Sequence, residues 1–495
     1  MAAKMASKTL SKSTLIVSSL TLISRVLGFV RDMLIAHYFG VNAATDAFFA
    51  AFRFPNFLRR LFAEGSFAQA FVPIISKHKN QDLSQIINKI SGHLALLLFV
   101  LTLVGMIAAP LLIMLCAAGF DWQSEQHILA TNLLQIMLPY GFLITLVAFF
   151  GSVLNAHSKF VIPAFTPALL NLSMITTTIW LSPFFEKPIY ALAVGVLLGG
   201  IIQLLFQFPA LWRLNLVPRF QLDFHDVIVK RVMKNLLPTL FATSATQINL
   251  LINTFLASFL VTGSVSWLYY ADRLLEFPLG ILGSGLATVM LPKLAQSHIE
   301  NNPKHFSMTI DWGLRWVVLL GIPATMGLIL LAEPILSALF ESAEFTASDV
   351  HASARSLQGY SFGLVGFLSV KILMPAFSTQ HLQTKAVRFA WYSLAGNLIL
   401  ATSLVITFAH AGIALATGLS AIVNASFLLF FLLKNKIYSP SNGWTLFLLK
   451  IGFASSVMIA VLQYFYPTSI WRLILCVVIS CVSYFAVLWL IKVKT

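Results

Sequence analysis

The stretch from Leu94 to Cys116 reads LALLLFVLTLVGMIAAPLLIMLC and contains no charged residue. A helix needs roughly 20 predominantly apolar residues to cross the hydrocarbon core of a bilayer, so this run is long enough to span it. The whole chain of 495 residues is 58% hydrophobic and 10% charged, whereas soluble domains are about 25% charged. A membrane β-barrel would show short alternating strands, and the sequence has no such pattern. It therefore predicts an all-α polytopic membrane protein.

Apolar runs of similar length recur along the chain. They predict fourteen transmembrane helices, at 14–38, 44–73, 91–118, 130–155, 160–183, 188–212, 232–261, 265–292, 312–340, 354–378, 386–409, 411–433, 444–466 and 470–491. The basic residues before the first run resemble a signal peptide, but no small-residue cleavage site follows. We therefore expect an uncleaved first helix.

Lysine and arginine are unevenly distributed between the predicted loops. The turns that follow odd-numbered helices hold only Lys187, Arg355 and Arg472, together with several acidic residues such as Asp121 and Glu344. The turns that follow even-numbered helices, together with the two termini, hold many more basic residues: Lys77, Lys79, Lys89, Lys159, Arg213, Arg219, Lys230, Arg231, Lys293, Lys304, Lys385, Lys434, Lys436, Lys492 and Lys494. Basic residues are retained on the cytoplasmic side. The pattern predicts an inner-membrane protein with both termini in the cytoplasm.

An internal repeat divides the chain. Residues 67–77, FAQAFVPIISK, match residues 286–296, LATVMLPKLAQ, at an offset of 219. A repeat of this length predicts two parallel six-helix lobes, at 1–226 and 227–438, followed by a terminal helix pair at 439–495. Transporters built from such repeats usually bind substrate between the halves and alternate access around it.

Charged residues interrupt several predicted spans. They are Arg25, Arg31 and Asp32 in the first, Asp46, Arg53, Arg59, Arg60 and Glu64 in the second, Asp272, Arg273 and Glu276 in the eighth, and Lys371 in the tenth. A charge at the bilayer centre costs at least about 2.5–3.5 kcal/mol, so these side chains are expected to face a cavity or a partner.

The spacing of these charges predicts where they lie. At about 100° per residue, the charges at 46, 53, 60 and 64 form one polar stripe on their helix, and those at 25 and 32 share a face. Arginine suits diphosphate, because its planar fork donates two hydrogen bonds to phosphate oxygens. The surplus of arginine therefore predicts a cationic cavity for an anionic substrate. The alternative is that pairs such as Arg31–Asp32 and Arg273–Glu276 only hold helices together.

Other function classes receive little support from the sequence. The net charge is +15, but no basic patch is interleaved with aromatic residues as in nucleic-acid binders. Nucleotide-binding, metalloprotease and hydrolase motifs are absent from the sequence, so we expect a transporter rather than an enzyme. Cys116, Cys476 and Cys481 lie in apolar runs without metal spacing and are interpreted as core residues.

Six motifs together resemble one known family. They are SRVLGFVRD at 24–32, TDAFF at 45–49, PNFLRR at 55–60, FAEG at 62–65, AFVP at 70–73 and YYADR at 269–273. Over essentially its whole length the chain is similar to the MurJ (MviN) family, the lipid II flippases of peptidoglycan synthesis. The resemblance implies the fold of the MOP exporter superfamily, with two lobes related to the MATE multidrug exporters and two terminal helices that line a lipid groove.

The resemblance also implies site residues and a substrate. The essential cavity arginines of the family fall on Arg25, Arg31, Arg59 and Arg273. Arg53 joins them as a substrate-binding residue, and Asp32, Asp46, Arg60, Glu64, Asp272, Glu276 and Lys371 complete the cavity charge network.

By the same resemblance, the expected substrate is lipid II, whose diphosphate would enter the cavity while its polyprenyl tail stays among membrane lipids. We expect a monomer without a cofactor or metal, driven by an ion gradient or the membrane potential. The carboxylates of the sodium site described in some members cannot be placed here. A related exporter of other oligosaccharide-lipids or of drugs is the alternative, although a drug exporter would favour an acidic cavity.

Overall fold

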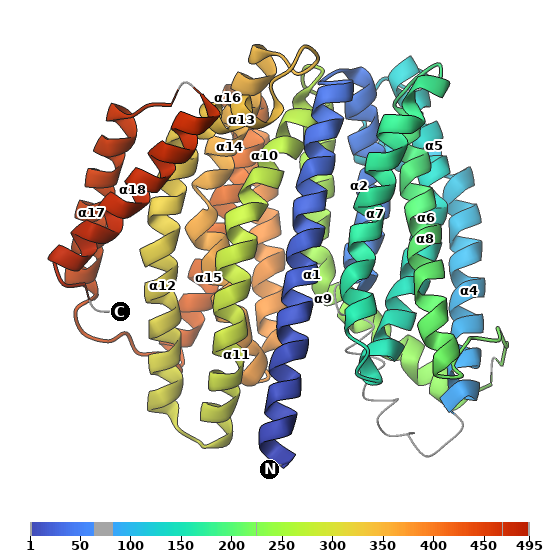
Figure 1. The fold of residues 1–495 in the computed structure, drawn as a ribbon, viewed down its shortest axis with the longest axis horizontal. Helices are drawn as coiled ribbons and strands as arrows, with labels where there is room; N and C mark the ends of the chain where they lie inside the picture. Colours follow the sequence, from blue (N-terminus) through green and yellow to red (C-terminus); the bar gives the residue numbers. More distant parts are fainter. Residues whose placement is uncertain (1, 64–82, 224, 468, 494–495) are drawn as a thin grey trace. The chain divides into compact units, whose positions relative to one another are not determined.

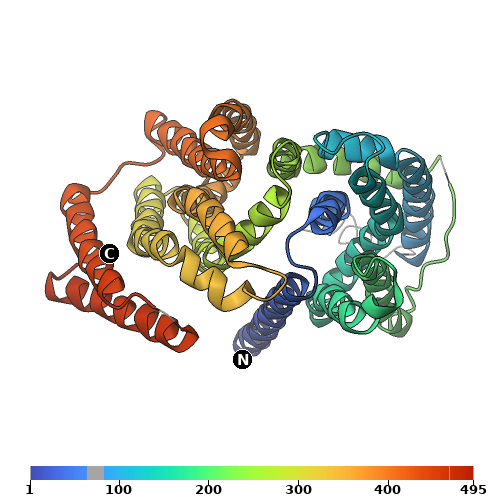
Figure 2. The same ribbon diagram turned by 90° about the horizontal axis from the view of Figure 1, so that it is seen from above.

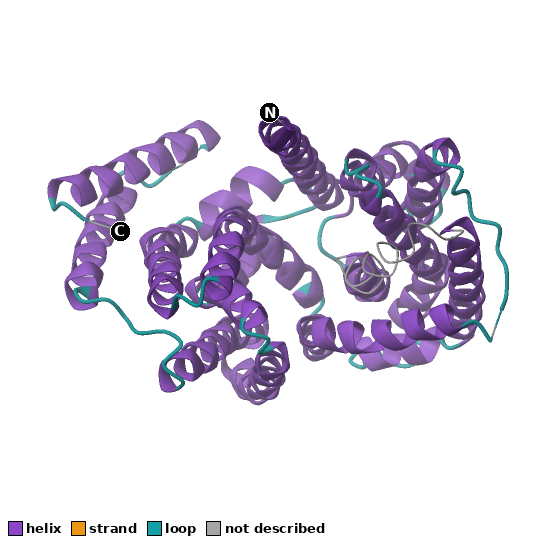
Figure 3. Ribbon diagram, turned by 90° about the horizontal axis from the view of Figure 1, so that it is seen from below, coloured by secondary structure: helices purple, strands orange, loops and turns teal. Residues whose placement is uncertain are grey.

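The computed structural model describes residues 2–63, 83–223, 225–467 and 469–493. All the regular secondary structure in these ranges is helical (Figure 3), which confirms the all-α class. The chain divides into two compact units, Met1–Thr262 and Gly263–Thr495. Glu64 and the first repeat copy at 67–77 lie outside the described residues.

The first unit is a helical bundle (Figure 1). Its elements are α1 (Ala2–Phe39), α2 (Ala43–Ala63), α4 (Leu83–Ile107), α5 (Ala109–Cys116), α6 (Glu125–Ala156), α7 (Val161–Trp180), the short 3₁₀ helix η1 (Ser182–Phe184), α8 (Tyr190–Arg213) and α9 (Val227–Ser258). α1 packs along α7, α7 packs on α8, and α2 packs on α6 and α9. This packing buries apolar faces and brings the charged residues of α1 and α2 against polar groups of α7 and α9.

The second unit contains the remaining helices. They are α10 (Ser264–Pro278), the π-helical turn η2 (Leu279–Gly283), α11 (Ser284–Ile299), α12 (Pro303–Leu330), α13 (Ala332–Phe340), α14 (Ala347–Ser361), α15 (Leu364–Thr379), α16 (Gln383–Lys434), α17 (Trp444–Tyr464) and α18 (Ile470–Leu490). α14 packs on α10 and α16, and α15 packs on α12 and α16. α17 and α18 form a pair (Figure 2), in which α17 also packs on α12.

Many of the helices are suited to a bilayer. Among the described residues, nine helices are long and apolar enough to cross a membrane, and the pair α14–α15, bent by 44°, brings the number to ten. Large apolar side chains point outward from them, and Ile107 and Ile406 are more than 80% exposed. Exposed apolar surface on this scale is typical of contact with lipid. The count of fourteen spans stays a prediction, since α1, α2 and α9 are helical but are not among the nine.

Breaks within the helices follow recognisable local causes. The backbone of α16 leaves the helical region at Ala409 (φ 49°, ψ −133°), which coincides with the turn predicted between 386–409 and 411–433. One residue, Ala108, separates the end of α4 from the start of α5, and Pro110 lies in the first turn of α5, where a missing N–H is tolerated. Cys481 is exposed on α18, so its interpretation as a core residue was wrong. An apolar run does not distinguish a lipid-facing position from a buried one.

The boundary between the units differs from the boundary of the repeat. By contact, α9 belongs to the first unit, where it packs on α2, α4 and α5. The repeat places it at the start of the second lobe, 227–438. The predicted lobes and the terminal pair at 439–495 stay predictions, because sequence similarity and spatial packing divide the chain by different criteria.

Candidate functional site

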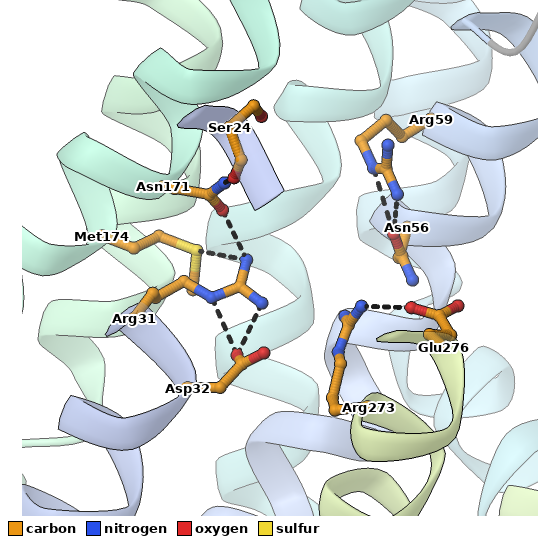
Figure 4. A network of polar contacts seen from close by, with 9 residues as sticks. All are labelled: Ser24, Arg31, Asp32, Asn56, Arg59, Asn171, Met174, Arg273 and Glu276. Carbon is orange, nitrogen blue, oxygen red and sulfur yellow. Dashed lines mark hydrogen bonds and ion pairs between the residues drawn. The ribbon is translucent and has the colours of Figure 1, made fainter. Parts of the chain in front are cut away.

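Arg31 is buried at the contact between α1 and α7. Its Nε and Nη2 donate to Asp32 Oδ1 at 2.9 and 2.6 Å, and its Nη1 donates to Asn171 Oδ1 at 2.9 Å (Figure 4). Met174 Sδ lies 3.9 Å from the same Nη1. Arg31 is 5% exposed and Asp32 2%. The ion pair that the sequence analysis named as the alternative is therefore present, and both of its members are buried.

Arg25, two turns earlier on α1, has different surroundings. It is exposed and lines a cavity of about 440 Å³ together with Thr21 of the same helix, Asn155 at the end of α6, and Phe160 and Pro163 at the start of α7. The lining combines a cation, hydroxyl and amide groups with apolar rings. Such a surface can contact both an anionic head group and the beginning of an apolar chain.

Two arginines of α2 donate to neutral polar side chains. Arg53, 9% exposed, donates from Nε to Thr254 Oγ1 of α9 at 2.9 Å. Arg59 donates from Nε and Nη2 to Asn56 Oδ1 at 3.1 and 2.9 Å (Figure 4). Asp46 is buried, Arg60 is partly buried, and Glu64 lies outside the described residues.

A second group of charges lies in the second unit. Arg273 Nη1 donates to Glu276 Oε2 at 2.9 Å (Figure 4). The guanidinium lies 4.9 Å from the centre of the Tyr269 ring. Lys371 Nζ donates to the carbonyl of Leu279 at 3.4 Å, in the π-helical turn. A Cβ at Gly283 would lie 2.7 Å from Lys371 Cδ, so glycine at this position leaves room for the lysine stem.

The Arg31–Asp32 and Arg273–Glu276 pairs are thus both present in the structure, while the substrate-binding roles stay predictions. Asp272 is partly buried beside this second group. Sequence reasoning missed the neutral partners Asn171, Asn56 and Thr254. An asparagine within an apolar span was the available signal, because a buried amide is costly unless its hydrogen bonds are made.

Comparison with known proteins supports one family. The family model described as "Lipid II flippase MurJ" matches residues 35–482. A relative from Vibrio cholerae, named "Probable lipid II flippase MurJ", is 42% identical over 463 residues, which cover 91% of this chain and 88% of the relative. A relative from Burkholderia cenocepacia, named "Lipid II flippase MurJ", is 37% identical over 505 residues and covers 98% of both chains.

Solved structures agree with this assignment. A structure described as "Lipid II flippase MurJ, inward closed conformation" is similar with a TM-score of 0.84 and 28% identity, covering 96% of this chain and 98% of the other. An inward-facing MATE family multidrug transporter of the MOP superfamily is similar with a TM-score of 0.70 at 14% identity, covering 86% and 98%. This second likeness shows a shared fold alone. From the family model and the relatives together, the chain belongs to the MurJ family of lipid II flippases.

Proposed function

We propose that the chain moves lipid II, the undecaprenyl-diphosphate-linked peptidoglycan precursor, from the cytoplasmic to the periplasmic leaflet. The observation that carries the proposal is membership of a family whose model, described as a lipid II flippase, matches residues 35–482. The mechanism we propose is alternating access around a cationic cavity. No separate observation favours a drug or another oligosaccharide-lipid as the substrate.

The arginines supply the chemistry that a diphosphate needs. Arg25 is exposed beside a cavity, and Arg59 and Arg273 are partly exposed. Arginine donates paired hydrogen bonds to phosphate oxygens. In our proposal, the diphosphate accepts hydrogen bonds from these arginines while the lipid is carried, and these bonds break when the lipid leaves on the periplasmic side. The substrate-binding group is then Arg25, Arg31, Arg53, Arg59 and Arg273, although the buried contacts of Arg31 favour an indirect role.

The remaining parts of the proposal concern the membrane. Helices of spanning length and membership of this family indicate an integral inner-membrane protein. We place both termini in the cytoplasm, from the distribution of lysine and arginine. The polyprenyl tail would stay in lipid along α17 and α18, which expose large apolar side chains such as Leu449, Trp471 and Trp489. An ion gradient or the membrane potential would supply the work.

Reconstitution tests the proposal directly. The purified protein is placed in liposomes that contain labelled lipid II, and the fraction of label that a membrane-impermeant enzyme can reach is followed over time. We expect protein-dependent translocation that Arg25→Ala and Arg273→Ala reduce roughly tenfold to a hundredfold, because charge-assisted contacts contribute about 1.5–3 kcal/mol each. Arg→Lys should recover part of the rate, since an ammonium cannot make the bidentate contact. Protein that is folded and reconstituted but leaves lipid II in its original leaflet, with an ion gradient and a membrane potential imposed, would contradict the proposal.

A further inference from the structure

Asn171 links two parts of α1 to α7, and no motif or family resemblance assigns it a role. Its Oδ1 accepts from Arg31 Nη1 at 2.9 Å, and its Nδ2 donates to the main-chain carbonyl of Ser24 at 2.9 Å (Figure 4). The residue is 8% exposed. Because one end of the amide accepts and the other donates, these two bonds fix its orientation.

The bond to Ser24 requires the two helices to approach closely. A carbonyl inside an α-helix normally accepts from the N–H four residues later, here that of Gly28. A side chain at position 28 would obstruct a second donor, since a Cβ there would lie 3.2 Å from Asn171 Nδ2. At about 100° per residue, Ser24, Gly28 and Arg31 fall within about 60° of one another on α1. They form the face of α1 that lies against Asn171.

We propose that Asn171 is a positioning residue, which fixes the rotation and height of α1 against α7 and so determines where Arg25 is presented. Arg25 follows Ser24 directly and lies about 100° around the helix from it, so a contact that fixes Ser24 also fixes the direction of Arg25. In that direction Arg25 lines the cavity with Asn155 and Pro163. The inference rests on the proposed function, because it assigns Asn171 to an arginine proposed to contact the diphosphate.

A purely structural role makes a different prediction from a positioning role. If Asn171 only accepted from Arg31 or packed against it, aspartate would replace it well, since it has the same size and accepts more strongly from a guanidinium. Positioning also needs the Nδ2 donor. Asn171→Asp removes that donor and sets a carboxylate oxygen against the Ser24 carbonyl. Gly28→Ala perturbs the same bond from the other helix while Asn171 stays intact.

The test uses the full chain with Cys116, Cys476 and Cys481 replaced by alanine and a reporter cysteine introduced by Thr21→Cys. Thr21 lines the same cavity one turn before Arg25. We would measure the rate of labelling by a water-soluble maleimide, membrane abundance and lipid II translocation on the same preparations. For both Asn171→Asp and Gly28→Ala we expect normal abundance, a labelling rate changed at least about threefold, and translocation lowered roughly tenfold.

Two matched variants serve as controls. Gly105→Ala on α4 places a Cβ 3.5 Å from Leu138, an ordinary contact. Asn132→Asp changes a partly buried amide whose Nδ2 donates to Tyr190 Oη at 3.3 Å, away from α1. Both should label and translocate like the parent protein.

The outcomes separate this inference from the proposed function. Wild-type labelling and translocation in both Asn171→Asp and Gly28→Ala overturn the positioning role, whatever Arg25→Ala does. If Arg25→Ala translocates lipid II normally, the proposed role of Arg25 fails, and a changed labelling rate in Asn171→Asp still supports the positioning of α1. If Arg25→Ala is inactive while Asn171→Asp is fully active, only the positioning role fails.

Discussion

At the scale of single residues, two arginines on α1 differ in what surrounds them. Arg31 is buried against Asp32 and Asn171, whereas Arg25 is exposed at a cavity. By family resemblance, both fall on positions of essential cavity arginines. Packing indicates that Arg31 holds α1 against α7, whereas Arg25 is the arginine that we propose contacts the substrate. We expect the loss of either to lower transport, but for different physical reasons.

Arg31→Ala should therefore lower stability. It removes the cation that neutralises buried Asp32, and breaking a buried pair from one side costs about 3–5 kcal/mol. We expect reduced membrane abundance and a lower unfolding temperature in detergent, with partial recovery in the double variant Arg31→Ala, Asp32→Asn. Arg25→Ala, at an exposed position, should change stability by no more than about 0.5 kcal/mol. Equal stability of the two single variants would contradict this distinction.

At the scale of elements, a buried carboxylate ties α12 to the segment that precedes α17. Asp311 accepts from Tyr438 Oη at 2.7 Å, from Trp444 Nε1 at 2.7 Å and from Ser441 Oγ at 2.6 Å. Arg315 Nε donates to the same carboxylate at 2.9 Å. Burial and the bond to Asp311 raise the pKa of Tyr438, so the phenol remains a donor. This polar cluster orients α17, while apolar packing of Phe447 and its neighbours holds the pair α17–α18 on α12.

Asp311→Ala should loosen this attachment. Several buried donors would lose their acceptor, and we expect a loss of about 3–5 kcal/mol by analogy with broken buried pairs. The measurement is thermal unfolding, together with protease cleavage between α16 and α17, which should become faster. Asp311→Asn, which keeps the shape, should lose less. As a control, Glu125→Gln removes an exposed ion pair with Lys187 and should leave both readouts unchanged. If Asp311→Ala and Glu125→Gln had equal effects, the role of Asp311 would be refuted.

The linker between α8 and α9 is anchored to α4 by charge. Lys89 Nζ donates to Asp223 at 2.8 Å and to Asp226 at 2.9 Å, and the main chain of Gln221 donates to the carbonyl of Asn88 at 3.2 Å. The hydrogen bond from Lys89 lowers the pKa of Asp223 below its ordinary value of 3.8. A lowered pKa in the folded state means that the contribution to stability is present above the ordinary value and is lost as the pH falls through the lowered one.

The anchor should consequently be insensitive to pH around neutrality and should weaken in acid. At pH 7, Asp223→Asn should accelerate amide hydrogen exchange in residues 214–223 relative to the parent protein. Glu300→Gln, on the exposed turn after α11, should leave this exchange as it is. If Asp223→Asn exchanges like the parent at pH 7, the pair between Lys89 and Asp223 does not hold the linker.

At the scale of the whole molecule, the sequence predicted most of the helices but few of the contacts between them. Run length and composition locate the helices, because a bilayer requires long apolar segments, and the break at Ala409 fell where two runs met. Arg31 and its partner Asn171 are 140 residues apart, and no local pattern encodes such a contact. The exposure of Cys481 and the packing of α9 in the first unit were likewise not predictable, since both depend on which faces of the helices meet.

Orientation in the membrane is the prediction that involves the whole chain at once. Lys159 and Lys434 lie in turns predicted to be cytoplasmic, and Asp121 and Glu344 in turns predicted to be periplasmic; all four are exposed. Because each helix reverses the side of the next loop, one span too many or too few would invert every later loop. Single cysteines at these positions, in a chain with its three native cysteines replaced by alanine, should report the side. An impermeant maleimide added to intact cells whose outer membrane has been made permeable should label 121 and 344 and should reach 159 and 434 only after lysis. Labelling of 121 without 344 would mean an odd number of crossings between them and would refute the fourteen-helix arrangement. The reverse of the whole pattern would leave the number of spans intact and would place both termini outside.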